Sequence, residues 1–150
     1  MSLVHRPTAV AVAVLSGGLT IVLYAVTALL APTMVDLASS SSARNLALVA
    51  GLVLRVLAGR LGARQAWAAG GDLPVVLASA AAGGLAGWLV FPGLVSLLGV
   101  VTGTDVVAGL LRLLVDVVVW LVCVGAGAAS GRLTVPRPQL ARAGRPARGR

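Results

Sequence analysis

The sequence predicts an all-α protein, an integral membrane bundle of four transmembrane helices. The first observation is composition: 59% of the 150 residues are hydrophobic and only 11% are charged, with a mean hydropathy of +1.02. Soluble domains normally have about a quarter of their residues charged. The second is distribution, because the apolar residues form runs of the length, about 20 residues, that a helix needs to cross a bilayer. We expect one domain over residues 1–131, with helices at about 8–31, 45–67, 74–99 and 105–130.

The first expected helix follows a short basic lead, and Pro7 suits the opening position of a helix. From Thr8 to Ala31 the chain carries no charge. A secretory signal peptide is the alternative, given Arg6 and the alanine-rich end of the run. The run is longer than the apolar region of an ordinary signal peptide, which favours a transmembrane helix.

This helix carries a polar stripe, defined by Ser16, Thr20, Tyr24 and Thr27. Spacings of four, four and three residues place these side chains on one helical face. Hydrogen bonding to neighbouring helices is the favoured role, since polar groups join helices inside membranes. A ligand pathway is the alternative.

The segment from Pro32 to Ala43 is expected to be a loop because it holds proline, aspartate and four consecutive serines. The second helix follows and is interrupted by Arg55. On a helical wheel Arg55 shares a face with the small residues Gly51 and Ala58, whereas large aliphatic residues occupy the other face. Small residues mark the packed side of a membrane helix. We therefore expect Arg55 to point into the bundle.

A tight turn at 68–73 leads to Pro74 and the third helix, in which Gly83 and Gly87 lie four residues apart. This pattern of small residues permits close approach of another helix. Pro92 removes one backbone hydrogen bond and should kink or end the helix. The apolar segment after it is expected either to continue as a bent helix or to lie in the membrane interface.

The fourth helix carries Arg112 and Asp116 one turn apart, on a face shared with Gly109. Asp116 lies eleven residues after Asp105, and Arg55 lies eleven residues after Arg44. At 1.5 Å per residue both side chains reach a depth of roughly 16 Å, near the middle of the hydrocarbon. We expect a charge cluster of Arg55, Arg112 and Asp116, with Asp105 capping it from outside.

Three interpretations of this charge cluster remain open. It could be an ion-paired latch that fixes the register of two helices. It could attract an anion or carry protons, because charges inside membranes commonly serve a function. It could also be completed by a charge on another subunit.

The basic residues predict the orientation. Arg6, Arg60, Arg64 and the tail lie on one side of the expected spans, against Arg44 alone on the other, which places both termini in the cytoplasm. The tail at 132–150 is rich in proline and arginine and has no acid. We expect it to contact anionic lipid headgroups or an acidic protein partner, through Arg132, Arg137, Arg142, Arg145, Arg148 and Arg150. Nucleic-acid binding is not expected, since the tail has no aromatic residue.

The chain has a single cysteine, Cys123, and a single histidine, His5, so the sequence predicts neither a disulfide within the chain nor a metal or haem site. No catalytic motif is recognisable. We expect a non-catalytic, multi-pass protein of the cell membrane without a cofactor, acting as an accessory or scaffold subunit or as a homo-oligomer. The alternative is a small channel, transporter or holin-like pore that uses the charge cluster. A membrane enzyme is the third possibility.

Overall fold

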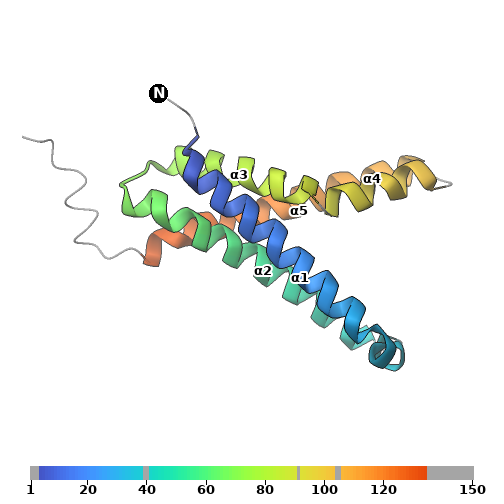
Figure 1. Ribbon diagram of the computed structural model, residues 1–150. Coiled ribbons are helices and arrows are strands. Elements are labelled where there is room, and N and C mark those ends of the chain that lie inside the picture. Colours follow the sequence, from blue (N-terminus) through green and yellow to red (C-terminus); the bar gives the residue numbers. More distant parts are fainter. Residues whose placement is uncertain (1–3, 39–40, 91, 104–105, 135–150) are drawn as a thin grey trace, which may run out of the picture.

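The computed structural model describes residues 4–38, 41–90, 92–103 and 106–134. The described elements are all helices, which confirms the all-α prediction (Figure 1). They are α1 (Arg6–Ala38), α2 (Ser41–Ala68), α3 (Leu73–Val90), α4 (Pro92–Thr102), α5 (Val106–Gly131) and the short 3₁₀ helix η1 (Arg132–Thr134). Four segments of the described helices are long and apolar enough to cross a membrane: Arg6–Val26, Asn45–Ala68, Leu73–Val90 and Val106–Gly131.

The expected loop between Pro32 and Ala43 is wrong in extent. Helix α1 continues through Pro32 to Ala38, and α2 already begins at Ser41. Polar residues show where the chain would leave the hydrocarbon layer, but they do not by themselves end a helix. A helix continues as long as its backbone hydrogen bonds continue. Serine is also favoured at a helix start, which suits the first turn of α2.

The third expected helix, 74–99 with a kink at Pro92, is divided into two helices. Helix α3 ends at Val90, and α4 begins at Pro92 and continues to Thr102. Proline is well suited to the first turn of a helix because its missing N–H has no partner there in any case. The chain after Pro92 is therefore helical, and α4 lies roughly end to end with α3 (Figure 1).

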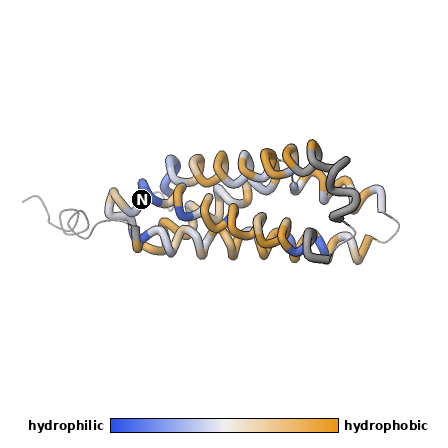
Figure 2. Tube along the Cα trace, turned by 90° about the horizontal axis from the view of Figure 1, so that it is seen from below, coloured by the Kyte–Doolittle hydropathy of each residue, from blue (hydrophilic) through white to orange (hydrophobic). Residues whose placement is uncertain are grey.

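The helices pack closely at one end of the molecule and separate at the other. At the closed end, α1 lies against α2 and α3, and α5 lies against the same two helices. At the open end, α1 and α2 diverge from α4 and from the amino-terminal half of α5 (Figure 1). No residue of 45–57 or 106–119 is fully buried. Hydrophobic residues nevertheless run along most of each helix (Figure 2).

Three tryptophans, Trp67, Trp88 and Trp120, form the hydrophobic core together with several alanines and valines. Trp67 is 2% exposed and donates its indole N–H to the carbonyl oxygen of Ala128 over 2.8 Å. Trp120 is fully buried.

The turn that joins α2 to α3 is made by Gly70 with a φ of 74°, a left-handed conformation that favours glycine.

Glycines allow the backbones to meet at the closed end. A Cβ atom added at Gly59 would overlap the carbonyl oxygen of Val124, and one added at Gly127 would overlap that of Val56. These two positions join α2 and α5, and neither was predicted as a packing site. A Cβ atom added at Gly83 would likewise overlap the carbonyl oxygen of Ala9.

The other glycines predicted to pack behave differently from one another. A Cβ at Gly87 would lie 2.8 Å from the carbonyl oxygen of Ala13, so Gly87 shares the tight contact between α1 and α3. Gly109 faces α4, where its Cβ would lie 3.1 Å from Val100. A Cβ at Gly51 would meet only the side chain of Leu23, at 3.9 Å. Gly51 is thus not at a close helix contact, because the helices have already begun to separate there.

Candidate functional site

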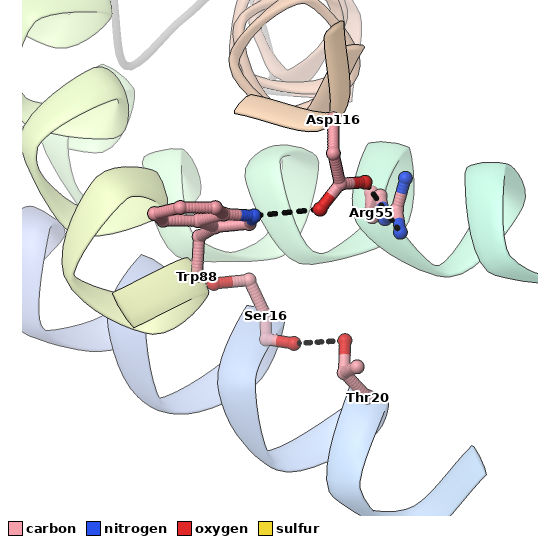
Figure 3. A network of polar contacts seen from close by, with 5 residues as sticks. All are labelled: Ser16, Thr20, Arg55, Trp88 and Asp116. Carbon is pink, nitrogen blue, oxygen red and sulfur yellow. Dashed lines mark hydrogen bonds and ion pairs between the residues drawn. The ribbon is translucent and has the colours of Figure 1, made fainter. Parts of the chain in front are cut away.

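A charged network joins three helices where the molecule begins to open. Asp116 on α5 accepts a hydrogen bond from the indole N–H of Trp88 on α3, with 2.7 Å between Nε1 and Oδ2. Its other oxygen, Oδ1, lies 3.9 Å from Nη2 of Arg55 on α2 (Figure 3). The side chains of Arg55 and Asp116 are 20% and 34% exposed. The pair is therefore accessible from outside the protein.

Arg55 is also held by an aromatic ring. Its guanidinium carbon lies 4.4 Å from the ring centroid of Trp120, within the range of a cation–π interaction. Trp120 follows Asp116 by one helical turn, so the ring and the carboxylate face Arg55 from the same side of α5. The indole nitrogen of Trp120 is buried and has no hydrogen-bond partner among the described residues. The ring and the carboxylate together fix the position of the Arg55 charge.

The network forms the floor of a cleft of about 730 Å³ bounded by α1, α2 and α5. The cleft has polar groups from Thr20, Tyr24, Arg55, Arg112 and Asp116. The rest of its lining is glycine, alanine, leucine and valine. A second groove of about 300 Å³ lies between α4 and α5 and is lined partly by Ser96. Arg112 and Asp116 line both hollows.

The predicted charge cluster is therefore a pair and a separate arginine. Arg55 and Asp116 lie together, but Arg112 is exposed, and no carboxylate of the described residues lies within 4.0 Å of it. The spacing of Arg112 and Asp116 brings their backbones close on α5. The carboxylate oxygens of Asp116, however, are directed to Trp88 and Arg55. Asp105, the expected cap, lies outside the described residues.

Two residues of the polar stripe, Ser16 and Thr20, donate their hydroxyl groups within their own helix. The Ser16 hydroxyl donates to the carbonyl oxygen of Val12 over 2.6 Å, and Thr20 donates to that of Ser16 over 2.7 Å (Figure 3). Serine and threonine in a helix can satisfy themselves on the preceding turn in this way. Tyr24 is 53% exposed at the cleft. The side chain of Thr27 lies outside the described residues.

The structure describes only the first arginine of the tail. The guanidinium carbon of Arg132 lies 5.9 Å from the ring centroid of Trp67, at the closed end. The other five predicted contact residues lie outside the described residues: Arg137, Arg142, Arg145, Arg148 and Arg150.

Sequence reasoning missed Trp88 and Trp120 as members of the site. A signal was present for Trp120, which lies in the interior of the span Val106–Gly131 and not near its end, where tryptophan is enriched in membrane proteins. Trp88 lies two residues before the end of the span Leu73–Val90 and gave no such signal. An indole N–H in an apolar interior needs a partner, and Asp116 supplies one for Trp88.

Comparisons with known proteins give no match: no family model, curated protein or solved structure is similar to the chain. Within the described residues, no group of three or more histidine, cysteine, aspartate or glutamate side chains could hold a metal ion. Chemically, the site offers one compensated ion pair, an additional arginine and an apolar wall.

Proposed function

We propose that the chain is a non-catalytic, multi-pass protein of the cell membrane, which acts by association within the bilayer as an accessory or scaffold subunit or as a homo-oligomer. One observation carries the proposal: a partly exposed ion pair, Arg55 with Asp116, forms the floor of an otherwise largely apolar cleft. Charged groups in a membrane interior are costly and are normally enclosed by protein or face a polar partner. A protomer alone leaves this pair open on one side, so we infer that the cleft is covered in the cell.

The arginines support both termini in the cytoplasm. Arg6 at the start of α1, Arg60 and Arg64 near the end of α2, and Arg132 after α5 belong to the ends of helices that meet at the closed end. Arginine near span ends favours the cytoplasmic side. Under this orientation the cleft opens toward the outer leaflet, and the arginine-rich tail meets anionic headgroups on the inner side.

The packing supports association more than catalysis. The glycines at close contacts, Gly59, Gly83 and Gly127 among them, are used within the protomer. Small-residue packing therefore explains the fold of the protomer. The diverging helices of the open end remain as surfaces for a partner. Asp116, the acid in the cleft, is engaged by Trp88 and Arg55, which does not suit it to act as a general base.

A small channel, transporter or holin-like pore is the second candidate. Arg112 and Asp116 line both the cleft and the groove on the α4 side. Polar side chains thus reach two hollows around α5, as an ion pathway would require.

Purification in mild detergent, followed by light scattering and a liposome leakage assay, separates these candidates. We expect a discrete oligomer or a complex with other membrane proteins, and liposomes that stay sealed. Arg55- or Asp116-dependent leakage would support the pore and contradict the scaffold.

Reporter fusions test the orientation separately. A reporter after Arg150 should be cytoplasmic, and one inserted between Ala38 and Ser41 should lie outside. Replacement of Arg60 and Arg64 by glutamine should weaken this preference, because it removes positive charge from the cytoplasmic end of α2. An external carboxyl terminus would overturn the topology.

A further inference from the structure

The cleft combines an apolar wall with an uncompensated positive charge. Asp116 is compensated by Arg55, so these two residues form a neutral unit. Arg112 adds a second positive charge, and no carboxylate of the described chain lies within 4.0 Å of it. The described lining of the cleft therefore has an excess of one positive charge, which an anionic group would balance.

Arg112 lies at the right depth for a lipid headgroup. It follows the first residue of α5, Val106, by six positions, which is a rise of roughly 9 Å along the helix axis. A long arginine side chain can extend from that depth to the headgroup region while its stem stays in the hydrocarbon. Asp116 lies four residues further along, roughly 6 Å deeper, at the floor of the cleft.

The apolar walls of the cleft suit a hydrocarbon chain. Leu48 and Leu52 on α2 and Val115 and Val119 on α5 line the cleft. Ala47 and Gly51 leave space on the α2 side of the cleft, because they line it without a large side chain. The volume of about 730 Å³ falls within the range of sites for small amphipathic ligands, roughly 300–1,000 Å³.

The geometry points to a binding site for an anionic phospholipid, with the phosphate on Arg112 and an acyl chain between α2 and α5 down to the Arg55–Asp116 pair. Charge complementarity and the open side of the cleft favour this occupant. A transmembrane helix of a partner fits less well, because it would meet small residues on the α2 wall, at Ala47 and Gly51, but Val115 and Val119 on the α5 wall. This inference rests on the proposed membrane location.

Native mass spectrometry of the full chain in detergent tests the site. The two probes are phosphatidylglycerol and phosphatidylcholine with identical acyl chains, so that only the headgroup charge differs. We expect the wild-type protein to retain phosphatidylglycerol at least fivefold better, since one arginine near an anionic surface contributes about fivefold and the tail arginines add to it. The Arg112→Gln variant should lower this preference about fivefold, to the level that the arginines outside the cleft supply. Arg64→Gln, which removes an exposed arginine at the closed end, should lower it less.

A second variant tests the acyl-chain wall independently of charge. Gly51→Leu should fill the cleft and reduce retention of both lipids, and it should fold because a Cβ there meets only Leu23 at 3.9 Å. The matched control is Gly125→Leu, since a Cβ at Gly125 meets nothing within 4 Å. A thermal unfolding curve of each variant confirms that it is folded.

The possible failures are distinguishable. Recovery of the protein in the soluble fraction without detergent would overturn the membrane location itself. A membrane-integrated protein without a preference for phosphatidylglycerol, or with one that Arg112→Gln leaves unchanged, would overturn the lipid site alone. An oligomer that depends on Arg112 and retains no lipid would assign the cleft to a second copy of the chain.

Discussion

Trp88 donates its indole N–H to the carboxylate of Asp116 over 2.7 Å and thereby ties α3 to α5 in a stretch of α5 where no residue is fully buried. The same carboxylate faces Arg55 of α2. Asp116 thus holds α2, α3 and α5 together at the point where the helices begin to separate. This bond makes Asp116 important for stability whatever the cleft binds.

Replacement of Asp116 should separate the hydrogen bond from the charge. Asp116→Asn keeps an oxygen for Trp88 and should lower the free energy of unfolding by about 1 kcal/mol. Asp116→Leu leaves both Trp88 and Arg55 without their acceptor and should cost about 2 kcal/mol. That is less than the roughly 3–5 kcal/mol of a fully buried pair, because this pair is partly exposed. Unfolding by SDS, followed by tryptophan fluorescence, measures both values. Equal stability of the two variants would contradict the assigned hydrogen bond.

The coupling between Trp88 and Asp116 can be measured directly. In a double-mutant cycle with Trp88→Phe and Asp116→Leu, the two changes should be non-additive by about 1 kcal/mol, since either one removes the same hydrogen bond. Trp67→Phe in place of Trp88→Phe serves as the control, because Trp67 bonds to Ala128 at the closed end. Additive effects of Trp88→Phe and Asp116→Leu would show that the bond contributes nothing.

The contact between α2 and α5 should be sensitive to a single methyl group. Gly127→Ala places a Cβ on the carbonyl oxygen of Val56 and should destabilise the protein by about 1–3 kcal/mol, as overpacking typically does. Gly125→Ala, two residues away, meets nothing within 4 Å and should be neutral or stabilising by up to about 1 kcal/mol, because alanine is the better helix former. Thermal unfolding in detergent compares the two. A neutral Gly127→Ala would mean that the helices are further apart than described.

The polar stripe on α1 should tolerate loss of its hydroxyl groups. Ser16 and Thr20 bond to their own helix, so Ser16→Ala and Thr20→Val should each change the free energy of unfolding by about 0.5 kcal/mol or less. Circular dichroism during thermal unfolding is sufficient to measure this. Destabilisation of several kcal/mol by either change would restore the interhelical role that the spacing first suggested.

The Arg55 site should distinguish arginine from lysine. Arg55→Lys keeps the charge near Asp116, but it loses the planar group that lies over Trp120 at 4.4 Å. We expect a loss of about 0.5–1 kcal/mol, the value of a cation–π contact at a partly exposed site. The fluorescence emission of the protein should also shift. Arg64→Lys, which is exposed at the closed end, should show neither effect.

The sequence alone predicted the helices and part of the site. Its long apolar runs specify helix, because in an apolar medium the backbone must satisfy its own hydrogen bonds. The wheel of α2 also placed Arg55 with the small residues, and the large residues of the opposite face, such as Leu46 and Val53, are indeed exposed. The equal spacing of Arg55 from Arg44 and of Asp116 from Asp105 predicted one depth for the two side chains, and the structure places them 3.9 Å apart. These properties depend on local periodicity and chain length, and both are written in the sequence.

Only the tertiary structure decided which partner each polar group has and where the bundle opens. The sequence could not show that Asp116 faces Trp88 and Arg55 and not Arg112, because that choice depends on how α3 and α2 rotate against α5. Nor could it show that Gly59 and Gly127 draw α2 and α5 together at one end while the amino-terminal parts of these two helices diverge at the other. Whether two helices pack closely or diverge depends on how near their backbones can come, and the helices concerned are distant in the sequence. The cleft, and the excess of one positive charge among its described lining residues, result from that arrangement.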